Sequence, residues 1–275
     1  MPRARQTLGK YRIEKRLSRG PRASVYRAYD TIHGVKVALK IAEPSQMSDE
    51  FLDEFRREAR LSVRMEHANV LPIQNAAFID GLFTIAMPLG EESLADRMTR
   101  RMSSETALDF AEQALDAVAH AHSRNIIHCD VKPENFIIFD KKRLRLTDFG
   151  FSKVVVRNAQ KGSGSGTIGY LAPEQALGRP MSQSDVFSLG LVICQEFSGP
   201  LPEWPFKWPP PGYARSRAKL RPKTLAGLRR AMEFQPQARD RDAVAMRRAN
   251  QTLPKKLVPR GRRCAARARG AGAAG

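Results

Sequence analysis

Apolar and polar residues alternate in short runs through the first part of the chain. The segments "YRIEKRLS", "ASVYRAYD" and "VKVALKIA" have this pattern, and "DTIHG" between the last two is rich in turn formers. Alternation of this kind predicts strands of a small twisted sheet. Two more strands are expected in "PIQNAAFID" and "LFTIAMP", joined at Asp80-Gly81, a dipeptide typical of hairpin turns.

A helical pattern interrupts these strands. In "SDEFLDEFRREARLSVRMEH", the side chains of Phe51, Phe55, Ser62 and Met65 recur at helical spacing, and Ser48 stands where an N-cap is expected. We therefore predict one helix between the third and fourth strands.

The chain changes character after Leu89. "SSETALDFAEQALDAVAHAHSRN" predicts a long helix with Ala107, Ala111, Ala114 and Val118 in register, and further helices follow. The Pro-rich "GPLPEWPFKWPPPGY" is expected to be a loop. A sheet-rich first third followed by a helical remainder predicts an α+β fold with two lobes.

Composition narrows the class of protein. The 275 residues suffice for a real core, and no apolar run is long enough to span a membrane or to act as a secretory signal. Three widely spaced cysteines fit a reducing cytoplasm. The formal charge of +19 is concentrated partly in residues 251–275, which are rich in Arg, Ala and Gly. We expect a disordered tail there, with at most weak attraction for nucleic acid or an acidic partner.

Polar side chains are dense in "IIHCDVKPENFII". If "FIIF" and "LRLT" pair as a hairpin across the turn "DKKR", Asn135 and Asp148 lie side by side at one sheet end. An amide oxygen and a carboxylate suit Mg²⁺. In the preceding loop, the carboxylate of Asp130 could accept a proton from a hydroxyl, and Lys132 could stabilise transferred phosphate charge.

A second pair of charged residues lies outside this segment. Glu58 falls within the apolar stripe of the predicted helix, where a buried carboxylate needs a cationic partner, and Lys40 in "VKVALKIA" is a candidate. The alternative is that Glu58 bends out to solvent and that Lys40 is an ordinary strand lysine.

The order of these residues along the chain resembles a known family. A strand Lys, a helix Glu, an Asp-x-Lys-x-x-Asn loop and a "DFG" follow one another as in protein kinases. The quoted matches are "VALK" (37–40), Glu58, "HCDVKPEN" (128–135), "DFG" (148–150), "APE" (172–174), "SDVFSLG" (184–190) and "PQAR" (236–239). From about Tyr11 to Ala249 the chain resembles the eukaryotic-like Ser/Thr protein kinases, and "GTIGYLAPEQ" looks most like their bacterial members.

The resemblance implies a role for each matching residue, with ATP and Mg²⁺ (or Mn²⁺) as cofactors. Lys40, held by Glu58, would bind the α- and β-phosphates. Asp130 would be the catalytic base, and Lys132 would contact the γ-phosphate. The remaining implied roles are metal binding by Asn135 and Asp148, adenine and loop contacts by Leu17, Ser18, Gly20, Val25, Ala38, Met87 and Leu89, a structural ion pair between Glu174 and Arg239, and support of the catalytic loop by Asp185.

Two departures from the family pattern change the expectation. The glycine-rich loop becomes "SRGPRASV", so phosphate binding there should be weaker, with Pro21 lacking a backbone N–H. Cys129 replaces the Arg of the usual His-Arg-Asp. This resembles a non-RD kinase, whose activity is not expected to depend strongly on loop phosphorylation. Within the activation segment, Ser163, Ser165 and Thr167 are the candidate phosphoacceptors.

We therefore expect a basic extension at residues 1–10, a kinase domain at 11–250 with lobes at 11–87 and 88–250, and the tail at 251–275. The expected activity is transfer of the ATP γ-phosphate to Ser and Thr hydroxyls of protein substrates, with autophosphorylation, and the oligomeric state stays open. The main alternative is a pseudokinase scaffold or regulatory binding protein of the same fold. A second alternative is a small-molecule kinase of the aminoglycoside or choline type, which would lack Lys132 and the Arg239 partner. A third alternative, a nucleic-acid-binding protein, is supported only by the basic tail and the high pI.

Overall fold

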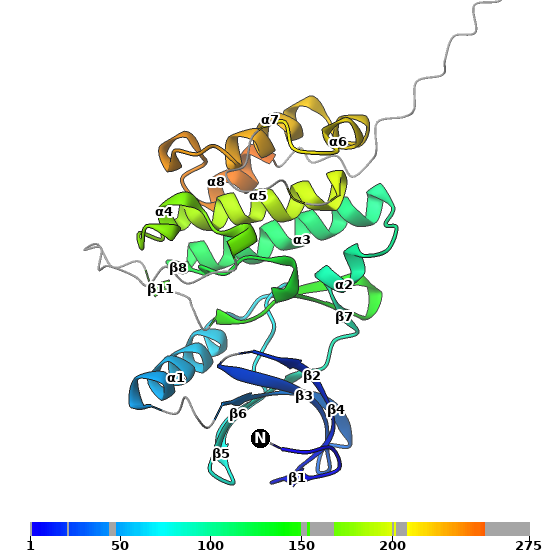
Figure 1. Cartoon of the computed structure of the whole chain (residues 1–275), viewed down its shortest axis with the longest axis vertical. Coiled ribbons are helices and arrows are strands. Elements are labelled where there is room, and N and C mark those ends of the chain that lie inside the picture. The colour runs from blue at the N-terminus through cyan, green and yellow to red at the C-terminus, as the bar shows by residue number, and fades with distance from the viewer. Residues whose placement is uncertain are drawn as a thin grey trace, which may run out of the picture.

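The computed structural model describes residues 2–20, 22–43, 48–149, 153–154, 168–199, 201 and 208–250. Figure 1 shows a β-rich half, coloured blue to cyan, below a helical half, coloured green to orange. The predicted α+β arrangement with two lobes is confirmed.

The first half is one curled antiparallel sheet with strand order β1-β2-β3-β4-β6-β5. Its strands are β1 (Thr7–Leu8), β2 (Tyr11–Arg19), β3 (Ala23–Asp30), β4 (Val35–Ala42), β5 (Asn75–Ile79) and β6 (Leu82–Pro88). The hairpin turn at Asp80-Gly81 has positive φ at both residues, as the dipeptide predicted. Strand β1 was not expected: it pairs with β2 and incorporates part of the N-terminal extension into the sheet.

Helix α1 (Asp49–Val63) covers one face of this sheet. Phe55 on α1 packs edge-on against Phe83 on β6, with ring centroids 5.8 Å apart. Ser62 and Met65 are buried as the apolar stripe predicted, whereas the side chain of Phe51 lies outside the described residues. This packing fixes which side of α1 faces the sheet, and Glu58 is on that side.

The second half is mainly helical. Its helices are α2 (Leu94–Met98), α3 (Ser104–Ser123), α4 (Pro173–Ala176), α5 (Ser182–Ser198), α6 (Tyr213–Lys219), α7 (Pro222–Ala231) and α8 (Ala243–Asn250). Its short strands are β7 (Glu92–Ser93), β8 (Ile126–Ile127), β9 (Phe136–Phe139), β10 (Arg143–Leu146) and β11 (Lys153–Val154). Part of the predicted Pro-rich loop, residues 202–207, lies outside the described residues.

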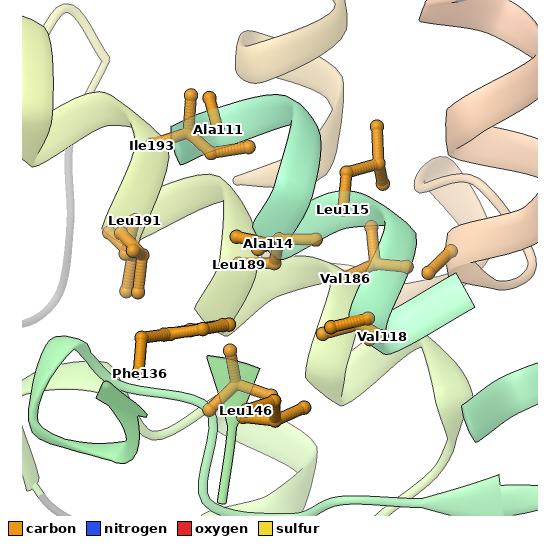
Figure 2. Packing of buried hydrophobic residues seen from close by; sticks show 14 of the residues in the cluster. Ala111, Ala114, Leu115, Val118, Phe136, Leu146, Val186, Leu189, Leu191 and Ile193 are labelled. Atoms are coloured by element: carbon orange, nitrogen blue, oxygen red, sulfur yellow. The ribbon is translucent and has the colours of Figure 1, made fainter. Parts of the chain in front are cut away.

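Helices α3 and α5 form the centre of this half. The four residues predicted in register on α3 are all buried. Figure 2 shows Phe136 and Leu146 of the β9–β10 hairpin pointing toward side chains of these helices, among them Leu191 and Val118. The hairpin is therefore anchored to the helical core, and the loops at its end are held in place by it.

Candidate active site

The β9–β10 hairpin brings the predicted metal ligands together. Phe136 pairs with Leu146 in the register of the two strands. One step further, the Thr147 N–H donates to the carbonyl oxygen of Asn135 over 2.8 Å. Asn135 therefore adjoins the chain immediately before Asp148, which is the geometry that the "FIIF" and "LRLT" pairing predicted.

Lys40, Glu58 and Asp148 meet in one ion-pair network. Lys40 Nζ lies 2.7 and 2.9 Å from the two carboxylate oxygens of Glu58 and 2.9 Å from Asp148 Oδ1. Glu58 is only 4% exposed, so the alternative in which it bends out to solvent does not hold in this structure. The network joins a strand, a helix and the residue that follows the β9–β10 hairpin.

The electrostatics of this network favour a charged lysine. Burial by itself lowers the pKa of Lys40, but the carboxylates of Asp148 and Glu58 outweigh it, so the pKa is raised above its ordinary value. Burial raises the pKa of Glu58, and the charge of Lys40 opposes that shift. The positive charge of Arg22, at the tip of the β2–β3 loop, also lowers the pKa of Glu58. A cation from this loop therefore acts on the same site, which the sequence alone did not suggest.

A second cluster forms around the carboxylate of Asp130. The amide Nδ2 of Asn135 donates to the Asp130 carbonyl oxygen over 2.7 Å and to Asp130 Oδ2 over 3.0 Å. Lys132 Nζ lies 2.8 Å from the same Oδ2. A lysine and an amide thus hold one carboxylate oxygen in a fixed direction, which suits a group that must receive a proton at a set position.

Asp185 supports the loop that carries Asp130. Its two carboxylate oxygens accept the backbone N–H groups of His128 and Cys129 over 2.7 and 2.9 Å. The side chain of His122 donates from Nε2 to Asp185 over 2.9 Å, because its Nδ1 accepts the Ala243 N–H. Asp185 is fully buried. A carboxylate of helix α5 therefore holds the loop in place through these hydrogen bonds, as the resemblance implied.

Comparison with known proteins decides the family. A model of the protein kinase domain matches residues 11–207, which is more than half of the chain. The chain belongs to the protein kinase family. The crystal structure of the PknI kinase domain from Mycobacterium tuberculosis has the same fold, with a TM-score of 0.68 and 23% identity over 91% of this chain and 99% of that one.

Bacterial kinases are among the similar sequences. Serine/threonine-protein kinase PrkC of Bacillus subtilis is 33% identical over 70% of this chain and 31% of its own length. Serine/threonine-protein kinase PknA of Mycobacterium tuberculosis is 36% identical over 73% of this chain and 50% of its own length. The chain therefore spans a third to a half of the length of these relatives. Within the described residues, no helix is long and apolar enough to cross a membrane.

The side of the kinase site expected to bind adenine lies between the two halves. Ala38 on β4 and Met87 on β6 are cross-strand partners and both are buried. The following Gly90 leaves no room for a side chain, since a Cβ there would lie 2.9 Å from the Ile138 carbonyl oxygen. Leu89 precedes this close contact and is half-buried. The segment of residues 88–91 is thus held against β9.

The loop that keeps only the middle glycine of the family pattern is closed by backbone contacts. Ser18 on β2 pairs with Val25 on β3, and the Gly20 N–H donates to the Ala23 carbonyl oxygen over 2.9 Å. Leu17, also expected at adenine, is 44% exposed. Because the Gly20 N–H is engaged within the loop, it is less available for phosphate, and weaker phosphate binding stays a prediction.

The loop around Cys129 has a support that the sequence did not reveal. Cys129 is buried and adopts φ of 66°, in the left-handed region. The side-chain amide of Gln175 on α4 donates to the Cys129 carbonyl oxygen over 2.5 Å. The His128 ring contacts both the Thr147 carbonyl oxygen and the Phe149 ring. Cys129, which stands where the usual Arg was expected, is therefore held in place through its backbone carbonyl group.

The last predicted contact joins α4 to the end of the domain. Arg239 donates from Nη1 and Nη2 to the two carboxylate oxygens of Glu174 over 2.8 and 3.1 Å, and both residues are buried. The guanidinium also lies 4.6 Å from the Phe187 ring. The candidate phosphoacceptors Ser163, Ser165 and Thr167 lie outside the described residues.

Proposed function

We propose that the chain is a Ser/Thr protein kinase that transfers the γ-phosphate of ATP to Ser or Thr hydroxyls of proteins. The observation that carries this proposal is the network in which Lys40 contacts both Glu58 and Asp148. A buried lysine that is shared between a helix carboxylate and the loop after β10 has a clear use in binding phosphates.

Each step of the reaction has a residue that can perform it. Asp130 accepts the proton of the attacking hydroxyl, whose oxygen forms a bond to the γ-phosphorus while the bond from that phosphorus to the leaving ADP oxygen breaks. Lys132 neutralises charge on the transferred group, and Lys40 holds the α- and β-phosphates. Both lysines act mainly by position and charge.

The donor set also fits a divalent cation. The Asn135 Nδ2 donates to Asp130, so its Oδ1 remains as an oxygen donor. Asp148 directly follows Thr147, whose N–H donates to the Asn135 backbone carbonyl. An amide oxygen and a carboxylate are ligands that Mg²⁺ accepts while it keeps several waters, and Mn²⁺ has similar preferences. Such an ion would neutralise phosphate charge, and Asn135 would position both it and Asp130.

The proposal extends to the domain limits and the setting. We infer a kinase domain at residues 11–250, with its lobes meeting after residue 87, a preceding extension, and a tail from residue 251. We also infer that, with Cys129 in place of the usual Arg, activity does not depend strongly on loop phosphorylation, and that the protein works in the cytoplasm. The two described cysteines, Cys129 and Cys194, support the last point because both are buried and neither forms a disulfide.

The test is phosphate transfer by the purified protein with labelled ATP, Mg²⁺ and a Ser- and Thr-rich acceptor protein. Wild type should label Ser and Thr, and Asp130→Asn should lose about 10²- to 10⁴-fold in rate. The matched control is Asp140→Asn, which changes an exposed carboxylate at the turn between β9 and β10. Mass spectrometry then maps the modified residues, including any at Ser163, Ser165 or Thr167.

The alternative is a pseudokinase scaffold, and the closed glycine loop favours it. Wild type that transfers nothing at high ATP, but whose melting temperature rises with ATP and Mg²⁺, would establish that reading. Equal labelling by wild type and Asp130→Asn would instead remove Asp130 from the role of base.

A further inference from the structure

A cavity of about 510 Å³ opens on the helical half, away from the residues assigned to catalysis. Its walls come from the end of α2, the connection from α2 to α3, the C-terminal end of α5, and α6. Figure 1 shows these segments on one side of the helical half, with α6 near the end of α5. A volume of this size is in the range of ligand sites and can hold several side chains.

Positive charge dominates the lining. Four cations contribute, namely Arg100, Arg101, Arg215 and Lys219, against the single carboxylate of Glu196. Helices α6 and α7 are also rich in positive charge, since residues 213–232 contain seven Arg or Lys and no acid. The exposed Arg217, Arg221 and Lys223 therefore extend the same field beyond the cavity.

Within the part of the chain that the structure describes, most of these cations have no counter-ion. Arg100 is neutralised by Glu92, with Nη2 2.5 and 2.6 Å from its two oxygens. Among the described residues, no carboxylate forms an ion pair with Arg101, Arg215 or Lys219. Elsewhere the described chain pairs such residues, as with Arg230 and Asp240. Like charges gathered without partners raise the energy of the free protein, so an acidic occupant would relieve that repulsion.

Glu196 does not act as the counter-ion of this cavity, which we call the basic groove. Both of its carboxylate oxygens are buried and have no hydrogen-bond partner among the described residues. Burial raises the pKa of Glu196 well above its usual range, which reduces its negative charge. The net charge of the lining is therefore positive.

Part of the cavity lining is apolar. Met98, Met102 and Phe197 contribute to it, and all three pack in or against the hydrophobic core. An occupant that combines acidic residues with one apolar side chain would match both the cationic and the apolar parts of the lining, since charges steer and orient a ligand while buried apolar contacts anchor it.

We propose that this groove is a docking site for an acidic segment of a protein partner, with Arg101, Arg215 and Lys219 binding its carboxylates. Docking of this kind needs no phosphate transfer, so the failure of this inference and the failure of the proposed kinase activity can be told apart. A substrate that carries such a segment would be held near the kinase independently of its phosphoacceptor.

The test measures binding of a short labelled peptide, made of Asp and Glu around one Leu, by fluorescence anisotropy. Wild type should bind it with an affinity that falls as salt rises. The triple charge reversal Arg101→Glu, Arg215→Glu, Lys219→Glu should weaken binding by about tenfold or more. A neutral triple variant with Gln at these positions should give an intermediate loss, and its melting curve checks that the fold is kept.

The matched control reverses three exposed cations elsewhere, Arg64, Arg124 and Arg248, which changes the net charge by the same amount. Binding should then stay within about twofold of wild type. Equal losses in both triple variants would overturn the proposal, because net charge alone would explain them. It would also be overturned by tighter binding of a lysine-containing peptide, which would assign the groove to Glu196, or of a single-stranded oligonucleotide, which would make it a nucleic-acid site.

Discussion

At the scale of single residues, Glu196 shows how burial controls a charge. Glu196 lies on α5 and lines the same cavity as Arg100 and Arg101 from the α2–α3 connection and Arg215 and Lys219 from α6. None of these cations hydrogen-bonds to it, since both oxygens lack a partner among the described residues. The ionised form therefore loses its hydration without compensation.

This arrangement predicts a pH-dependent stability. Burial raises the pKa of Glu196 in the folded state, so its stabilising contribution is present at pH below about 4, near the ordinary value for Glu, and is lost as pH rises through the raised pKa. Glu196→Gln should therefore raise the melting temperature at pH 8 and have little effect near pH 4.

The control for this prediction is Glu91→Gln, which changes an exposed carboxylate directly before β7 in the helical half. Its melting curve should follow wild type at both pH values, since surface charges change stability little. A Glu196→Gln variant that is destabilised at pH 8 would show instead that the ionised carboxylate has a stabilising partner.

At the scale of elements, the buried pair Glu174–Arg239 ties α4 to the connection before α8. Arg239 also donates to the carbonyl oxygens of Gln183, Glu233 and Phe234, so one guanidinium serves three chain segments. Removal of either partner leaves a buried charge and several carbonyl groups unsatisfied.

We expect Arg239→Ala to lower the free energy of unfolding by about 3–5 kcal/mol. Urea denaturation monitored by circular dichroism gives this value directly. Arg230→Ala is the comparison, because Arg230 pairs with Asp240 in a position where its side chain is 41% exposed. That change should lower the unfolding free energy by at most about 1 kcal/mol. Equal losses in the two variants would show that burial of the Glu174 pair adds nothing.

Local spacing explains which contacts the sequence could predict. The ends of the β9–β10 hairpin meet because strand pairing is set by a short turn, and the sequence therefore placed Asn135 next to the residue before Asp148. The burial of Glu58 followed from its position in a helical stripe. The motif order supplied the partner, Lys40, across 18 residues.

Other contacts depend on how distant elements pack. His122 links Asp185 to the Ala243 N–H, 121 residues away in sequence, and no local pattern distinguishes His122 from its neighbours on α3. Gln175 supports the Cys129 carbonyl from α4 across 46 residues. The basic groove likewise exists only because α2, α5 and α6 end near one another. These features became visible only with the tertiary structure.

At the scale of the whole molecule, one lysine connects the two halves. Lys40 belongs to the β-rich half with Glu58, whereas Asp148 follows the hairpin that is anchored to the helical core. The position of α1 relative to the helical half therefore depends on a cation between two carboxylates. Without that cation, the two carboxylates would repel each other and both would resist ionisation.

Lys40→Met tests this coupling. The variant should lose about 10²-fold or more in phosphate transfer, and amide hydrogen exchange in α1 should accelerate because Glu58 loses its tether. The stability lost should return at low pH: burial raises the pKa of Glu58, and without the opposing charge of Lys40 nothing limits that rise, so Glu58 contributes stability below about pH 4 and loses it as pH rises through its raised pKa. Lys36→Met on the same strand is the control, since Lys36 is exposed. If exchange in α1 is the same in both variants, the two halves are held together by packing, and the role of Lys40 is confined to phosphate binding.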